Sequence, residues 1–274
     1  MNRSIIIALL VATIATTTTI VSAQTKITFG QLQQFNFTAP NVGDNMTLLL
    51  ESSPPAFFGL LVPCFGAVNL FVGVNRVPTP SANDRADYWD PNTLGSSFQF
   101  PNTNPGYVSS LVQANESYAD RPISFQFMIA ASNEDIYNKF PTPGNSGKIE
   151  LSLSNGGKSA TVKFTSTGSP NDTYAIYMFD GKLPKGAFPF SACGVRQLSP
   201  TPVANPTIID QGNNVNLATF NGLNPKTPTG ISVVVTNQLG FSTSYTYGIL
   251  NSSSSFIQAA PMLIVSLIAL VLFM

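Results

Sequence analysis

Alternation of apolar and polar residues with a period of two runs through the middle of the chain and predicts β-strands. In Ser159–Thr165, Ala160, Val162 and Phe164 fall on one face, and Lys163 falls on the other. Short runs of this kind, bounded by Gly, Pro, Asn and Asp, are typical of β-sandwiches. Away from the two ends, no window sustains the apolar period of an amphipathic helix. The pattern therefore predicts an all-β fold.

The strand pattern falls into two groups separated by a break. The break, Phe140–Gly147, holds two prolines and two glycines and is typical of a linker. We therefore expect one β-sandwich in residues 24–140, a linker in 141–147, and a second β-sandwich in 148–250. The predicted strands are Lys26–Phe29, Gln33–Phe37, Met46–Glu51, Phe57–Val62, Val68–Val74, Ser97–Phe100, Val108–Gln113, Ile123–Ala130, Lys148–Leu153, Ala160–Thr165, Thr173–Phe179, Asn216–Phe220, Gly230–Thr236 and Ser242–Leu250.

Both ends of the chain have the composition of processing signals. Residues 1–23 combine Arg3, an apolar run and the small residues Val21-Ser22-Ala23, which predicts a cleaved signal peptide. Residues 251–274 begin with small polar residues and end in the uncharged apolar run Pro261–Met274. This order predicts a signal for a glycosylphosphatidylinositol (GPI) anchor, attached at Asn251 or a following Ser. The alternative is a plain membrane-spanning tail, but no charged residue flanks the run as such a tail requires.

Charge and composition exclude several classes of function. Charged residues make up 9% of the chain, against an average of about 25%. Lys and Arg number 13, as do Asp and Glu, so no strong field exists to bind nucleic acid. The chain has no His, which removes the usual general base and the commonest metal ligand. We expect no cofactor and no catalytic site.

Sequons and cysteines indicate the secretory pathway. Asn-x-Ser/Thr sites occur at Asn36, Asn45, Asn115, Asn171 and Asn251. The first four are expected to carry glycans, because Asn251 is reserved for the anchor.

The two cysteines, Cys64 and Cys193, are an even pair and predict a disulfide in an oxidising compartment. The alternative is two buried free thiols, one in each domain, because the sequence does not give the distance between them.

The densest polar and aromatic stretch is Asn83–Asp90, a candidate ligand loop. Its carboxylates suit Ca²⁺, and its aromatic residues suit stacking on a sugar. The alternative is structural: Arg85 pairs with Asp84 or Asp87, and the sole Trp covers the end of a sheet. Elsewhere, Asn133–Asp135 is expected to be a solvated turn, and Glu150 to point outward from its strand. The candidate ligand residues are Asp84, Asp87, Tyr88, Trp89 and Asp90.

The order of motifs also resembles a known family. A strand, the corner Gly222–Pro225 and the strand Ile231–Asn237 resemble the end of a fibronectin type III module. Phe164 and Ile231 stand where that module usually has Trp and Tyr. Over about Met46 to Thr236, the chain resembles the neuron-derived neurotrophic factor family, which has two such domains after a signal peptide. The resemblance implies that both sandwiches, the second in residues 148–250 included, are immunoglobulin-like or fibronectin type III-like. The matching motifs are Val62-Pro63-Cys64, Phe125–Ser132, Tyr137 with Phe140-Pro141, Ala160–Phe164 and Ser191-Ala192-Cys193-Gly194.

The resemblance implies a secreted, glycosylated, non-catalytic binding protein. Together with the ends of the chain, it predicts a GPI-anchored glycoprotein on the outer face of the plasma membrane, with an unknown protein or glycan ligand. The alternative is an anchored carbohydrate-active enzyme or glycan-binding module. An enzyme of that kind would need two inward-facing carboxylates about 5–9.5 Å apart.

Overall fold

A computed structural model describes residues 24–38, 41–52, 54–87, 96–100, 106–115, 121–131, 139–204, 207–212, 214–251 and 257–258. The predicted signal peptide and most of the predicted anchor signal lie outside these residues. Within them, strands form four sheets, which confirms the all-β sandwich fold. None of the described helices is both long and apolar enough to cross a membrane.

The first sandwich packs a five-stranded sheet, β1-β3-β8-β5-β6, on a four-stranded sheet, β2-β9-β4-β7. Strand β1 pairs with β3 in parallel, and β3 pairs with β8 antiparallel. Alternate residues of both sheets, among them Leu48, Leu70 and Phe125, form one buried core, as the two-residue period requires. The strands are β1 (Thr25–Lys26), β2 (Gln33–Asn36), β3 (Asn45–Leu50), β4 (Phe57–Phe65), β5 (Val68–Val74), β6 (Arg85–Asp87), β7 (Ser96–Phe100), β8 (Val108–Ala114) and β9 (Ser124–Ala131).

The second sandwich has sheet orders β10-β11-β14-β13 and β12-β15-β17-β18, with β16 also paired to β15. Leaving out β18 and taking β16 and β17 as one strand, the order is that of constant-type immunoglobulin domains. Its elements are β10 (Ile149–Ser154), β11 (Ser159–Thr165), β12 (Thr173–Asp180), α2 (Ala192–Leu198), β13 (Thr207–Asp210), β14 (Val215–Asn221), β15 (Thr229–Thr236), β16 (Ser242–Ser244), β17 (Gly248–Leu250) and β18 (Ile257–Gln258), with 3₁₀ turns η1 (Gly144–Gly147) and η2 (Asn155–Gly157).

The faces of β11 are as predicted. Phe164 is 2% exposed and packs against Tyr174 and Tyr245, with ring centroids 5.3 and 5.5 Å apart. On the other face, the exposed Lys163 amine donates to Glu150 at 3.0 Å, so Glu150 points outward as expected. The alternation in the sequence therefore fixed both the register and the orientation of this strand.

Some short elements differ from the sequence-based expectation. The prediction that no helix lies outside the two ends was wrong, because α2 is a helix of seven residues. A helix of only two turns is too short to show an apolar stripe that repeats along its length. Strands β6, β13 and β18 were also not predicted, and the expected strand Ser242–Leu250 divides into β16 and β17.

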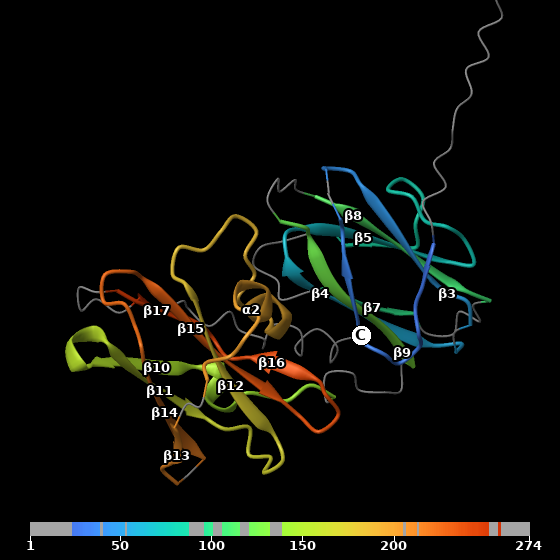
Figure 1. The fold of residues 1–274 in the computed structure, drawn as a ribbon. Helices are drawn as coiled ribbons and strands as arrows, with labels where there is room; N and C mark the ends of the chain where they lie inside the picture. The colour runs from blue at the N-terminus through green and yellow to red at the C-terminus, as the bar shows by residue number, and fades with distance from the viewer. Residues whose placement is uncertain are drawn as a thin grey trace, which may run out of the picture.

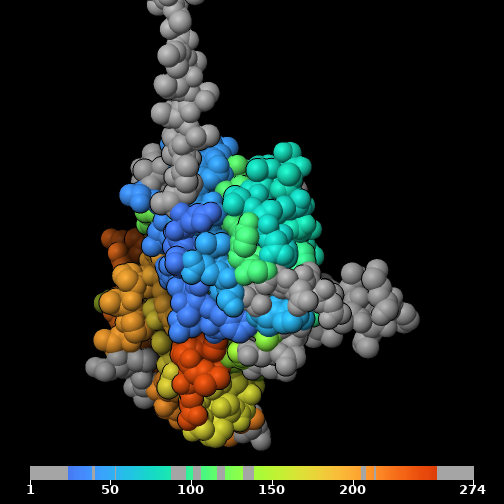
Figure 2. All heavy atoms as spheres, turned by 90° about the vertical axis from the view of Figure 1, so that its right-hand side faces the viewer, coloured from blue at the N-terminus to red at the C-terminus, as the bar shows by residue number. Residues whose placement is uncertain are grey.

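The two sandwiches lie side by side with α2 between them (Figure 1). Viewed from the side, the blue and green atoms of the first sandwich lie directly against the orange and red atoms of the second (Figure 2). Strand β17 ends at Leu250 beside Thr229, at the end of the sandwich that also holds the η2 turn. The linker enters at the opposite end, where Ile149 pairs with Phe164. The second sandwich therefore separates the first from Leu250.

Candidate functional site

A disulfide between Cys64 and Cys193 joins the two sandwiches covalently. Cys64 lies on β4, Cys193 lies on α2, and their Cα atoms are 5.0 Å apart although 129 positions separate them in sequence. Both residues are almost fully buried. The predicted bridge is confirmed, and the alternative of two free thiols is wrong, because the two sulfur atoms are bonded to each other across the domain boundary.

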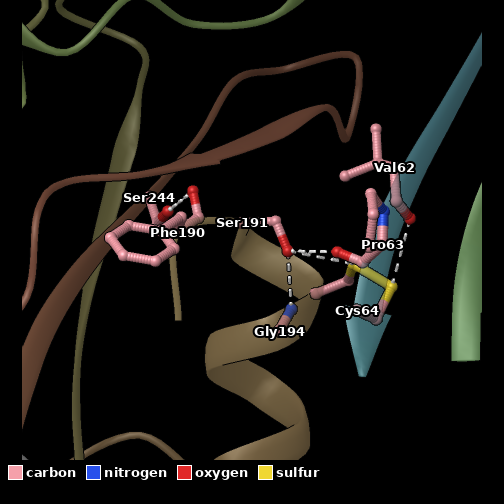
Figure 3. The surroundings of a disulfide bond; sticks show 8 residues. Val62, Pro63, Cys64, Phe190, Ser191, Gly194 and Ser244 are labelled. Carbon is pink, nitrogen blue, oxygen red and sulfur yellow. Dashed lines mark hydrogen bonds between the residues drawn. A yellow bond between two sulfur atoms is a disulfide. The ribbon is translucent and has the colours of Figure 1, made fainter. Parts of the chain in front are cut away.

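Ser191 positions the helix that presents Cys193 (Figure 3). It is the N-cap of α2, and its hydroxyl oxygen accepts from the Gly194 N–H at 3.0 Å. The same hydroxyl donates to the Pro63 carbonyl oxygen across the domain boundary at 2.8 Å. One buried side chain thus caps the N-terminus of α2 and holds the helix against β4, beside the disulfide.

Backbone groups extend the contact along the chain on either side of the disulfide. The Gly66 N–H donates to the Gly186 carbonyl at 2.8 Å, and Phe65 forms an isolated antiparallel bridge with Ala187. A strand edge of the first sandwich is therefore paired by the loop that precedes α2. This pairing satisfies backbone N–H and C=O groups that would otherwise lie at the domain boundary without hydrogen-bond partners.

Apolar side chains cover the rest of the boundary. On β4, Phe57, Leu61 and Phe65 face the core of the first sandwich, so by alternation Phe58, Leu60 and Val62 face the other way. This outer face is itself apolar and is packed with Met128 and Ala130 of β9, which are 1% and 0% exposed. Strands buried on both faces read as continuous apolar runs. The sequence of β4 thus reflects its position between two cores.

The linker and one turn of the second sandwich cover this outer face. Phe140 and Phe241 pack against it and against each other, edge to face, with ring centroids 5.0 Å apart. The Asn237 side-chain amide donates to the Lys139 carbonyl at 2.7 Å. We call these contacts, together with the disulfide and the Ser191 bonds, the interdomain clamp.

A polar groove lies at the linker end of the second sandwich, away from Leu250. It is formed by the loop after β11 and the turn between β13 and β14, and its volume is about 340 Å³. Asp172 in its wall accepts from the Thr167 hydroxyl at 2.7 Å, and Asp210 accepts from the Gly212 N–H at 2.8 Å. The lining residues are Ser166, Gly168, Ser169, Pro170, Asp172, Tyr174, Asp210, Asn214 and Asn216.

Two tyrosines support the loop that forms this groove. The Tyr174 hydroxyl accepts from the Thr167 N–H at 2.9 Å, and the Tyr245 hydroxyl donates to the Thr165 carbonyl at 2.6 Å. Burial raises the pKa of Tyr245 far above its usual value, and neighbouring Tyr174 raises it further. Tyr245 therefore stays neutral and anchors the loop to the core.

The candidate ligand loop is only partly within the described residues. Asp84 forms a two-point ion pair with Arg76, at 2.6 and 3.2 Å, and also accepts from the Val74 N–H. Asp87 pairs with Arg85 at 3.2 Å, as the structural alternative predicted for that residue. Tyr88, Trp89 and Asp90 lie outside the described residues, as does the predicted turn Asn133–Asp135. Across the described ranges, no three His, Cys, Asp or Glu side chains gather to hold a metal ion.

Of the four predicted glycan sites, all but Asn115 are exposed. Asn36 and Asn45 are exposed on β2 and β3, and Asn171 is exposed in the loop before β12. Asn115 is half-buried directly after β8. Asn251 is half-buried next to Leu250.

Comparison with known proteins adds a distant likeness in fold. No family model matches the chain, and no curated protein matches it. Among solved structures, the 1.0 Å crystal structure of the pre-peptidase C-terminal domain of a collagenase from Bacillus anthracis is similar at 10% identity. The match covers 39% of this chain and 95% of that domain, with a TM-score of 0.27. A likeness at this level says nothing about ligand or activity.

Proposed function

We propose that the chain is a GPI-anchored cell-surface glycoprotein with a non-catalytic binding role, in which the second sandwich is a rigid support for the first. The observation that carries this proposal is the interdomain clamp. Relative motion of domains is the default unless the interface is large and apolar. Here the interface is apolar, hydrogen-bonded and covalently closed by Cys64–Cys193. A fixed arrangement suits the display of a surface better than a mechanism that needs domain closure.

The path of the chain agrees with this role. Leu250 lies at the end of the second sandwich opposite the linker. A lipid attached at Asn251 would therefore leave the first sandwich farther from the membrane than the second. Strand β18 lies within the segment that anchor attachment removes, so the mature sheet would end at β17.

A compartment outside the cytosol is supported by the disulfide. Buried structural disulfides form and persist in oxidising environments. The relation to neuron-derived neurotrophic factor and to fibronectin type III modules remains part of this proposal and rests on the order of the sequence motifs. The alternative of a glycan-binding module is favoured by one observation, the polar groove.

The experiment is release of the protein from intact cells by phosphatidylinositol-specific phospholipase C. We expect the full chain to be released, with its first sandwich accessible to antibody before treatment. A matched variant whose residues 251–274 are replaced by a membrane-spanning helix with cytoplasmic Lys residues should stay bound. If the wild-type protein stays bound while a known anchored protein is released, the anchor is wrong.

A further inference from the structure

The polar groove has the chemistry of a site for a neutral, hydroxyl-bearing ligand. Its lining includes the carboxylates of Asp172 and Asp210 and the side-chain amides of Asn214 and Asn216, and none of the described residues that line it is cationic. An anionic ligand would therefore meet two negative charges without a partner. Small-molecule pockets of this size are usually lined by apolar side chains. A groove lined by hydroxyls, amides and carboxylates instead suits a hydrated ligand that exchanges hydrogen bonds, such as a sugar.

A glycosylation sequon lies on the rim of this groove. Asn171 is the third residue of the turn Ser169–Asp172, closed by the Asp172 N–H donating to the Ser169 carbonyl at 3.4 Å. The residues on either side of it, Pro170 and Asp172, both line the groove. Asn171 itself is exposed. A glycan on this side chain therefore begins within reach of the groove and needs no second molecule to supply the sugar.

We infer that the first sugars of an N-linked glycan on Asn171 lie in the groove and hydrogen-bond to its lining, Asn216 among them. The inference rests on the proposed function, because only a secreted chain receives this glycan. The glycan then becomes part of the second sandwich. It covers the end of the β11–β12 loop and the β13–β14 turn, where backbone groups of both loops meet, as in the Ser166 N–H bond to the Asn214 carbonyl at 2.7 Å.

The test is a double-mutant cycle on the secreted, glycosylated protein. Asn171→Gln removes the glycan, and Asn216→Ala removes one groove partner. We expect Asn216→Ala to lower the Tm by about 2–4 °C, the shift that follows loss of about one hydrogen bond in a chain of this size. In the Asn171→Gln background the same change should have no effect. Asn36→Gln is the matched control, because it removes an exposed glycan from β2, and there the shift should persist.

A second readout does not depend on the stability of any variant. Under native conditions, an amidase that removes N-glycans should act on Asn36 before Asn171, because the Asn171 sugars are shielded. Asp210→Asn, which keeps the acceptor for the Gly212 N–H, should speed removal at Asn171 only. Site-specific peptide mass spectrometry measures both sites in one sample.

Three results would overturn the inference. The first is an equal Tm shift for Asn216→Ala with and without the Asn171 glycan, because the groove residue is then merely structural. The second is equal removal rates at Asn36 and Asn171. The third is an unoccupied Asn171 in secreted protein. Release by the phospholipase is measured on the same cells. It tests the GPI anchor separately, so a failure of the anchor is distinguished from a failure of the Asn171 glycan to occupy the groove.

Discussion

Removal of the interdomain disulfide gives the sharpest test of the clamp. We consider the double variant Cys64→Ala/Cys193→Ala. Its bridge closes a loop of 129 positions, and the loop-closure model assigns a bridge of that length about 5 kcal/mol relative to the unfolded chain. In a protein of this size, about 1 kcal/mol corresponds to about 2–4 °C in Tm. The expected loss is therefore about 10–20 °C.

The shape of the unfolding transition is as informative as its midpoint. With the bridge intact, the two sandwiches should unfold together in one calorimetric transition. Without it, the interface depends on the Ser191–Pro63 bond and the apolar contacts of β4 and β9, so we expect two separate transitions. Reduction and alkylation of unfolded wild-type protein, followed by refolding, gives the same comparison without a substitution. A variant that melts once, within about 2 °C of the wild type, would refute the clamp.

Three further predictions test the second sandwich. Phe164→Ala should cost about 3–5 kcal/mol of unfolding free energy, whereas Lys163→Ala, which loses only a surface ion pair, should cost under about 1 kcal/mol; equal effects in thermal unfolding would mean that the register of β11 is wrong. Gly194→Ala should lower the free energy of unfolding by about 1–3 kcal/mol, because a Cβ there overlaps the Phe188 carbonyl oxygen. Helix propensity alone predicts that alanine stabilises the helix, so a raised Tm would contradict this packing. The raised pKa of Tyr245 contributes stability that is present below pH ~10 and lost above it, since only the unfolded tyrosine ionises there; denaturant titrations should show a weaker alkaline loss for Tyr245→Phe, and an unchanged profile would argue against its burial.

The strands were predictable because their apolar residues alternate with polar ones or form short apolar runs bounded by turn residues. Strand β5 has the predicted bounds, Val68–Val74, and Phe164 is buried as its alternation required. Helix α2 gives a weaker signal, because it is short and is fixed by a cap rather than by periodicity. Its only local signal is Ser191, a good N-cap residue, before a short run without Pro.

The clamp was predictable only in part. An even number of cysteines favours a bridge, but which surfaces it joins depends on distances that a sequence does not contain. One overlooked signal was β4, where nine residues from Phe57 to Phe65 are nearly all apolar. A strand with one wet face would alternate, so this run indicated a second partner for the sheet. The groove combines two loops far apart in sequence, and no local pattern predicts that.

The interdomain disulfide also sets an order of events during synthesis. Ribosomes add about 5–20 residues per second, so about 6–26 s pass between the translation of Cys64 and that of Cys193, 129 positions later. Once β9 completes the first sandwich, and until the second sandwich is made, the first has a lone thiol and an uncovered apolar face that includes Phe58, Leu60 and Val62. With no other cysteine in the chain, a wrong bridge can form only with another molecule. We therefore expect a thiol-handling chaperone to protect the nascent first sandwich until the second sandwich is made and covers it.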